Sequence, residues 1–221
     1  MQHPTTTDQP TPLGRRERNK LKVKERLYDA AITLFAEQGY DETSIDEIAE
    51  RADVARGTFF NYFQRKEDLL GAWGEKRRHT LLATLTHTTN NQQDTHNPTP
   101  TDTAVNQLRH CMTALGQINE THQQETNSLL MAWVRAGRPL LEDPYLAELF
   151  AHIAQQGITH NEFKPHFTPH QIGHALRDLY LGTLYRWCGQ PHTTPGQLTN
   201  ELHTTLNLIL QGILTTPTPH P

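Results

Sequence analysis

The chain has 221 residues, of which 35 % are apolar and 20 % are charged, and its formal net charge is −4. No run of about 18 apolar residues occurs, which argues against a membrane-spanning helix, and two cysteines are too few for a disulfide scaffold. The length allows one large or two small domains with a sizeable core, and we expect a cytoplasmic protein.

The first predicted helix follows a polar tail. Residues 1–14 are rich in Thr, Pro and Gln, a composition typical of a disordered tail. A helix is expected over about residues 16–38, and Gly39 is the residue type that commonly follows a helix end. The spacing of the apolar residues predicts one buried stripe on this helix. The stripe comprises Leu27, Ala31, Leu34 and Phe35.

Two short helices joined by a tight turn come next. Ser44 and Glu47 form the S-x-x-E pattern of a capping box, so a second helix is expected to begin there. A third helix is expected over about residues 56–63, and its inner face would carry Phe59 and Phe63. A long helix followed by two short ones predicts a homeodomain-like helix-turn-helix in residues 15–65, which presents its last helix to the major groove of DNA.

The remaining sequence predicts a second helical region. A connecting helix is expected over residues 66–85, and a flexible loop over residues 86–102, which contain no large apolar side chain. Residues 103–213 form a further helical domain, and residues 214–221 a second disordered tail. No stretch shows the alternation of a strand, so the fold class is all-α with about nine helices. The later helices are expected at about 103–126, 128–138, 144–160, 169–188 and 195–213.

A run of cations precedes the apolar part of the first helix. Seven Lys or Arg residues lie between Arg15 and Arg26, where only Glu17 and Glu25 are acidic. Screening confines the field of each charge to about 10 Å, so this local excess matters for DNA more than the negative total. The run is either a solvated surface or an arm that contacts the DNA backbone or the minor groove. The arm residues would be Arg15, Arg16, Arg18 and Lys20.

The predicted helix-turn-helix resembles that of a known family. The segment Thr43–Leu70, TSIDEIAERADVARGTFFNYFQRKEDLL, is similar to the DNA-binding domain of the TetR (tetracycline repressor-like) family, and Ala30–Tyr40 is similar to the helix before it. The resemblance covers about residues 20–75. It implies that a homodimer binds a palindromic operator in double-stranded DNA. It also implies that residues 103–213 dimerise and bind a small-molecule effector.

The resemblance implies a set of residues that face DNA. Arg and Asn side chains can bond guanine and adenine edges, hydroxyl and ammonium groups suit phosphates, and a glycine permits close approach of the backbone. The matching positions are Ser44, Arg56, Gly57, Thr58, Phe60, Asn61, Tyr62 and Lys66. The chain departs from the family pattern at Asp53, where a turn glycine is usual, and at Phe60, where a Tyr hydroxyl is usual. Ala55 and Arg65 stand where capping residues are usual.

The resemblance also implies that the last two helices pair with those of a second copy, which suits a two-fold symmetric operator. Both helices carry apolar stripes, and Gly182 would permit a close crossing between helices. The alternative is that both stripes belong to the core of one chain. The expected interface residues are Ile172, Leu176, Leu179, Gly182, Leu202, Leu206 and Ile209.

A ligand pocket would combine apolar and aromatic side chains with a few isolated polar groups inside helices. The alternative for each candidate is a place in the hydrophobic core. The candidates are Cys111, Met112, Leu115, Asn119, Met131, Trp133, Phe150, Tyr180 and Tyr185.

The sequence predicts neither catalysis nor a cofactor. Glu148 and His152 are four residues apart, which is not the Glu-x-x-His spacing of di-metal carboxylate centres. His166, His170 and His174 recur every four residues, but prolines interrupt the first interval and no Cys or carboxylate cluster joins them. We therefore expect no metal site and no catalytic residue.

The predicted function is a repressor that an effector releases from its operator, associated with the nucleoid when bound to DNA. The alternative is an architectural or partner-regulated DNA-binding protein that has no effector. A helical metalloenzyme is the weaker alternative.

Overall fold

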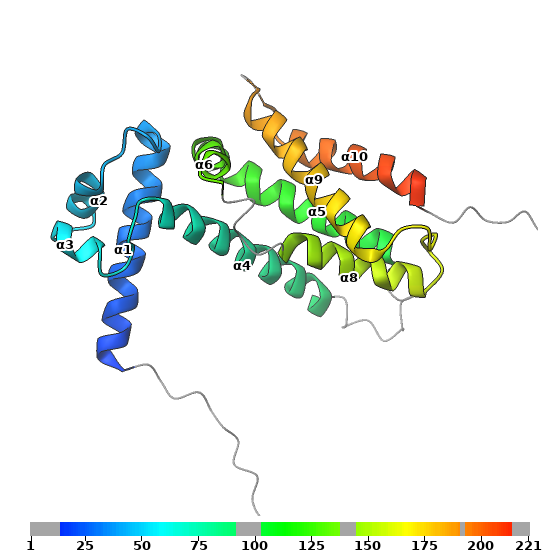
Figure 1. Ribbon diagram of the computed structural model, residues 1–221, viewed down its shortest axis with the longest axis horizontal. Coiled ribbons are helices and arrows are strands. Elements are labelled where there is room, and N and C mark those ends of the chain that lie inside the picture. The colour runs from blue at the N-terminus through cyan, green and yellow to red at the C-terminus, as the bar shows by residue number, and fades with distance from the viewer. Residues whose placement is uncertain (1–13, 92–102, 138–144, 191–192, 214–221) are drawn as a thin grey trace, which may run out of the picture. The chain divides into compact units, whose positions relative to one another are not determined.

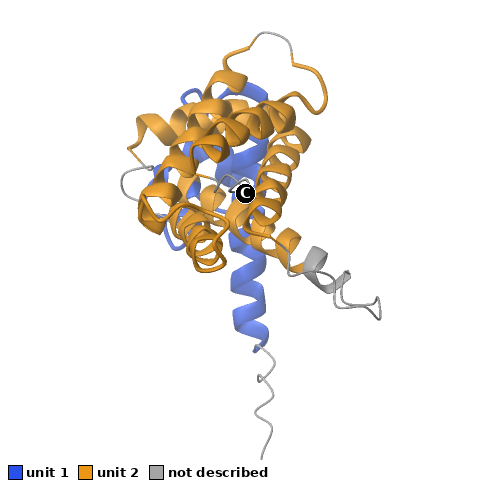
Figure 2. Cartoon of the chain, turned by 90° about the vertical axis from the view of Figure 1, so that its right-hand side faces the viewer, with its two compact units in different colours: residues 1–69 blue, residues 70–221 orange. Residues whose placement is uncertain are grey.

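The computed structural model describes residues 14–91, 103–137, 145–190 and 193–213, and every regular element in these ranges is an α-helix (Figure 1). The predicted all-α class is therefore confirmed, with nine helices in the described ranges. The chain divides into two compact units, Met1–Leu69 (unit 1) and Leu70–Pro221 (unit 2), which Figure 2 shows in different colours. Among the helices described, none has the length and hydropathy needed to cross a membrane.

Unit 1 is built on one long helix that packs against shorter ones. Helix α1 spans Arg15–Gln38, α2 spans Ile45–Arg51 and α3 spans Arg56–Phe59. The apolar stripe predicted for α1 is buried, and Ile48 and Ala49 of α2 are buried with it. The buried aromatic residues of this core are Tyr28, Phe35, Phe59 and Phe63.

The local signals at the start and end of α2 are present as predicted. Ser44 Oγ accepts the N–H of Glu47 at 3.2 Å, and the Glu47 carboxylate accepts the N–H of Ser44 at 2.8 Å. After α2 the backbone of Asp53 has φ 52°, a left-handed conformation that Asp adopts more readily than most residues other than Gly. Ala55 precedes α3 and supplies no side-chain cap.

Residues 56–63 are less helical than predicted. The α-helix expected over 56–63 ends at Phe59, and the chain continues as turns. The N–H of Asn61 donates to the carbonyl of Thr58, and that of Tyr62 to the carbonyl of Phe59, so these bonds span three residues rather than four. A helix that begins without a side-chain cap lacks one stabilising contribution of about 1 kcal/mol.

Helix α4 is longer than predicted. It spans Glu67–Asn91, so residues 86–91 are helical, while residues 92–102 of the predicted loop lie outside the described residues. The absence of apolar side chains in residues 86–91 did not indicate a loop, because backbone hydrogen bonds hold this part of the helix without them. Threonine hydroxyls also bond back within α4: those of Thr80 and Thr84 donate to carbonyls four residues earlier.

Unit 2 is a bundle of the remaining helices around one apolar core. The break between its first two helices falls at His122 rather than near residue 127, and the carbonyl of His122 accepts the Thr126 hydroxyl at 2.9 Å. Figure 1 shows α9 and α10 running beside each other. The helices are α5 (Ala104–Thr121), α6 (Gln123–Arg135), α8 (Tyr145–Thr159), α9 (Pro169–Cys188) and α10 (Gln197–Ile213).

Two glycines permit close contacts between helices of unit 2. A Cβ atom at Gly173 of α9 would lie 2.3 Å from the carbonyl oxygen of Ala147 on α8. A Cβ atom at Gly116 of α5 would lie 2.3 Å from Oγ1 of Thr199 on α10. In both helix pairs the backbone at the glycine lies directly against the neighbouring helix. Any larger residue at these glycines would push the helices apart.

Candidate nucleic-acid interface

The recognition segment, residues 56–62, is polar on the surface and anchored by aromatic rings below it. Thr58 and Tyr62 are half-buried. Phe59 and Phe63 are buried, with ring centroids 5.7 Å apart, and fix the segment to unit 1. The exposed residues are Arg56, Gly57, Phe60 and Asn61. The segment therefore offers two side chains that can bond base edges, one bare backbone position and one exposed ring.

Arg56 is held in place by an acidic residue of the preceding helix. Its Nη1 lies 2.8 Å from Oδ2 of Asp46 on α2, and the two side chains are 63 % and 62 % exposed. An ion pair this exposed contributes at most about 1 kcal/mol to folding. Its main consequence is that the guanidinium group has a defined position at the start of α3.

Gly57 has open space where a side chain would begin. A Cβ atom built there would meet nothing within 4 Å. Packing inside unit 1 therefore does not require a glycine at this position. The bare backbone is available to a phosphate or a base from outside, which fits the role predicted for it.

Ser44 lies at the N-terminus of α2, where a helix favours an anion. Glu47 supplies one: its carboxylate accepts the N–H and the hydroxyl of Ser44 at 2.8 and 2.7 Å. These two hydrogen bonds lower the pKa of Glu47 below its ordinary value. A phosphate at Ser44 has to compete with this carboxylate, and the contact stays a prediction.

Lys66 has partners inside unit 1. Its Nζ donates to the carbonyls of Tyr40 at 2.7 Å, Thr43 at 2.8 Å and Asp41 at 3.4 Å, and lies 4.4 Å from the centroid of the Tyr40 ring. These bonds use all three hydrogens of the ammonium group. Lys66 therefore holds the turn between α1 and α2, and a phosphate contact would require one of these bonds to break.

The basic residues are part of α1. Arg15, Arg16, Arg18 and Lys20 lie in its first turns and are exposed. An α-helix with its side chains is about 10–12 Å across, whereas the minor groove is about 6 Å wide. The helix itself does not fit the minor groove, so contact with the phosphate backbone is favoured, and both alternatives stay predictions for these side chains.

The predicted ligand residues separate into two groups in unit 2. Met131 and Tyr185 are 37 % and 50 % exposed and do not join the others, and Trp133 is half-buried against the core. The remaining candidates are buried in one core: Cys111, Met112, Leu115, Asn119, Phe150 and Tyr180.

Asn119 belongs to a buried polar cluster that the sequence pattern did not single out. Its Nδ2 donates to the Tyr180 hydroxyl at 3.0 Å, and its Oδ1 accepts from Nη1 of Arg77 at 2.7 Å. Nη2 of Arg77 donates to the Thr126 hydroxyl, also at 2.7 Å. One guanidinium group thus ties α4 to α5 and α6.

The same cluster contains its own counter-charge. Glu125 lies 3.6 Å from Nη2 of Arg77 and accepts from Nε1 of Trp73 at 2.6 Å, and the guanidinium lies 4.7 Å from the Trp73 ring centroid. A signal for Arg77 exists in the sequence. It falls on the helical repeat of Trp73 and Leu81, where an apolar residue would be usual.

Burial keeps the other titratable groups of this core neutral. It raises the pKa of the Cys111 thiol to about 12 and that of Cys188 to about 11. Burial also raises the pKa of the Tyr180 hydroxyl. Burial therefore disfavours the ionised form of all three groups.

The predicted dimer residues need correction. Ile172, Leu176, Leu202 and Leu206 are buried in the core of one chain, which is the alternative reading of the two stripes. Leu179 is half-buried, and a Cβ atom at Gly182 would meet only the Arg186 side chain, at 3.8 Å. Helical periodicity was right about the stripes, but it cannot say whether a stripe is covered by its own chain.

A different apolar surface remains open on these helices, and we call it the α9–α10 face. Leu208 is 65 % exposed and Tyr185 50 %, while Ile209 is half-buried. Two glycines lie beside them without internal contacts that require a glycine. The face comprises Gly182, Tyr185, Leu208, Ile209 and Gly212.

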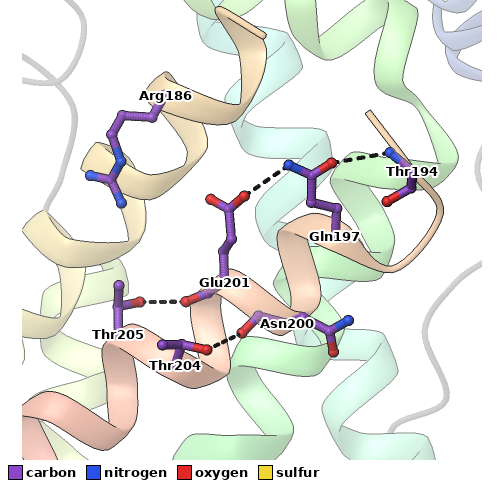
Figure 3. Close-up of a pocket in the computed structure, with 7 residues that line it drawn as sticks. All are labelled: Arg186, Thr194, Gln197, Asn200, Glu201, Thr204 and Thr205. Carbon is purple, nitrogen blue, oxygen red and sulfur yellow. Dashed lines mark hydrogen bonds between the residues drawn. The ribbon is translucent and has the colours of Figure 1, made fainter. Parts of the chain in front are cut away.

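A polar hollow of about 320 Å³ lies between α9 and α10 (Figure 3). In this hollow Nε2 of Gln197 donates to Oε1 of Glu201 at 2.9 Å, both on α10, and Arg186 lies on α9. None of the predicted ligand residues lines this hollow. Its lining residues are Arg186, Thr194, Gln197, Asn200, Glu201, Thr204 and Thr205.

Comparison with known proteins identifies residues 27–73 with the family described as bacterial regulatory proteins, tetR family. The regulator TcmR of Streptomyces glaucescens is 36 % identical over 66 residues, 30 % of this chain and 29 % of that protein. The fatty acid metabolism regulator protein of Bacillus subtilis is 44 % identical over 45 residues, 20 % of this chain and 23 % of that protein. These matches span less than a third of the curated relatives.

Solved structures match over most of the chain. FadR of Thermus thermophilus, a TetR-family repressor solved in complex with lauroyl-CoA, has a TM-score of 0.64 and 30 % identity, over 90 % of this chain and 98 % of that chain. SmeT, the repressor of the Stenotrophomonas maltophilia efflux pump SmeDEF, has a TM-score of 0.66 and 20 % identity, over 90 % and 97 %. The second likeness concerns the fold alone.

Proposed function

Because this chain belongs to the TetR family of bacterial regulatory proteins, we propose that it represses transcription by binding a palindromic operator as a homodimer and is released by a small-molecule effector. The matched proteins are transcriptional regulators rather than enzymes. The protein would act in the cytoplasm, at the nucleoid when bound to DNA.

The arrangement at the start of α3 carries the DNA-binding part of the proposal. Arg56 is exposed with a defined orientation, Gly57 leaves the backbone bare, and Asn61 is exposed a few residues later. Arg and Asn can each form paired hydrogen bonds with a base edge in the major groove. A bare backbone N–H is a common phosphate contact. The fold of unit 1 does not depend on these exposed groups.

The α9–α10 face supports the dimeric part of the proposal. Leu208 of α10 and Tyr185 of α9 are exposed, and burial of such apolar side chains contributes about 1.5–3 kcal/mol each. A second copy would cover the face by an isologous two-fold contact. The two glycines would let the partner helices approach closely.

The core of unit 2 supports the effector part. The similarity to Thermus thermophilus FadR, whose structure contains lauroyl-CoA, suggests a ligand with a long apolar chain. Unit 2 offers apolar side chains around buried Asn119 and Tyr180, which suits such a ligand. Lauroyl-CoA is therefore the first probe to use.

Operator release predicts a reciprocal effect between DNA and effector. Footprinting on the DNA that flanks the gene should reveal a palindromic site. An effector should weaken operator binding by about 5–150-fold, and operator DNA should weaken effector binding by the same factor, because the coupling is shared. Calorimetry with and without operator measures both. Equal lauroyl-CoA affinity for the free and the operator-bound protein would show that this ligand does not release the protein from DNA. If no compound in a panel of metabolites weakens operator binding, the architectural alternative is favoured.

The basic start of α1 should add affinity without adding base preference. Replacing Arg15, Arg16 and Arg18 by Gln should flatten the plot of log affinity against log salt by up to about 0.9 for each phosphate that the segment no longer touches. The preferred operator should not change. Arg135→Gln on α6 removes a cation outside this segment and should leave the slope as it is. An unchanged slope in the triple variant would show that the segment does not touch DNA.

A further inference from the structure

We propose that Asp46 is a positioning residue for base readout, which holds the guanidinium group of Arg56 in the orientation that reads a guanine. The inference rests on the proposed function, since it concerns how the DNA-binding unit selects its operator. Its basis is the 2.8 Å contact between Oδ2 of Asp46 and Nη1 of Arg56, which joins α2 to α3.

Folding does not explain the contact. Ion pairs with both partners more than half exposed contribute little to stability. The two helices are instead held by buried residues such as Ile48 and Phe59. An acidic side chain is also unfavourable on a surface that meets phosphates, because it repels them. An acidic residue in the first turn of α2 favours the helix dipole, but this does not account for the contact of Asp46 with Arg56, which positioning of the guanidinium group explains.

The geometry lets Arg56 bond Asp46 and a base at the same time. A guanidinium group has five N–H donors, and a guanine edge takes two of them through O6 and N7. One bond to Asp46 leaves four. A free arginine side chain loses rotamer freedom when it binds, and one already held by a carboxylate loses less. Asp46 thus favours the correct base, while its charge weakens binding to every DNA sequence alike.

Asp46 therefore raises the preference for the correct base and lowers the affinity for DNA in general, and the experiment measures the two effects separately. An operator is first selected from random duplexes with the unmodified protein, and affinities are then measured for this operator and for an unrelated duplex. Asp46→Asn should raise affinity for the unrelated duplex, because a negative charge is removed. The ratio of operator to unrelated affinity should fall about tenfold. Repeated selection should show relaxed preference at one base pair in each half-site.

The matched control is Glu50→Gln. Glu50 is exposed and lies four residues after Asp46, hence on the same face of α2, but the ion pair of Arg56 is made with Asp46. This variant should raise affinity for both duplexes equally and leave the ratio unchanged. Thermal melting of both variants checks that unit 1 remains folded.

A double-mutant cycle shows whether Asp46 acts through Arg56. Arg56→Ala should relax the same base pair, and adding Asp46→Asn to it should not lower the ratio further. An unchanged ratio in Asp46→Asn would overturn the inference, as would a raised ratio, which would mean that Asp46 withholds Arg56 from DNA. If the unmodified protein selects no sequence at all, the proposed function itself fails.

Discussion

Gly57→Ala should abolish tight operator binding while leaving the protein folded. The added methyl group meets no atom of unit 1, and the φ angle of Gly57 lies outside the left-handed range, so the fold tolerates alanine. Alanine in place of a helical glycine commonly stabilises a protein, here by up to about 1 kcal/mol. On DNA the same methyl group would hold the backbone away from a phosphate. A hydrogen bond to a charged group contributes about 1.5–3 kcal/mol, and a dimer would lose two, so we expect a loss of at least about 100-fold.

Fluorescence anisotropy with a labelled operator measures the loss, and thermal melting measures the stability. A larger residue, Gly57→Val, should weaken binding further if the backbone approaches DNA. A Gly57→Ala protein that binds the operator normally would show that this part of α3 stays clear of the DNA. One that binds poorly and also melts early would show that Gly57 serves the fold.

Leu208→Glu should convert the protein into folded monomers that no longer bind the operator tightly. Leu208 is 65 % exposed on α10, so a carboxylate there stays in water in the single chain. In a two-fold dimer it would be buried opposite its own symmetry mate or close to it, where unpaired charge is costly. A monomer has one recognition segment instead of two, and we expect operator affinity to fall by more than about 100-fold. Sedimentation measures the mass, and anisotropy the binding.

Val134→Glu is the matched control, because Val134 is also exposed but lies on α6 and does not belong to the α9–α10 face. It should leave both mass and binding unchanged. Leu206→Glu is unsuitable, since Leu206 is fully buried and a carboxylate there would unfold unit 2. A wild-type protein that sediments as a monomer at micromolar concentration would refute the dimer proposal directly.

Local signals in the sequence predicted unit 1 well because each depends on neighbouring residues only. The Ser44–Glu47 capping box and the apolar stripe of α1 are both of this kind. The length of α3 was predicted less well. Its end depends on how Phe59 and Phe63 pack, and a contact of this kind is invisible to a local pattern.

Unit 2 shows what periodicity leaves undetermined. The stripes of α9 and α10 were found, but whether Leu206 or Leu208 faces a partner depends on which helix of the same chain already covers it. The Arg77 cluster was missed for a related reason. Its partners Asn119 and Thr126 lie 42 and 49 residues away, and only the fold brings them together.

The contact between α5 and α10 joins segments that are made far apart in time during synthesis. The Glu120 carboxylate accepts the N–H of Leu198 at the start of α10, and Gly116 lies against Thr199; the bond from the Thr199 hydroxyl to Glu120 spans 79 residues. Helix α8 also packs on α5, but the part of α5 that α10 covers stays open until α10 has been made. Nascent chains are most prone to aggregate in this interval, when chaperones can still bind them. The α9–α10 face likewise forms only when α10 is in place, so the proposed pairing with a second copy follows this step.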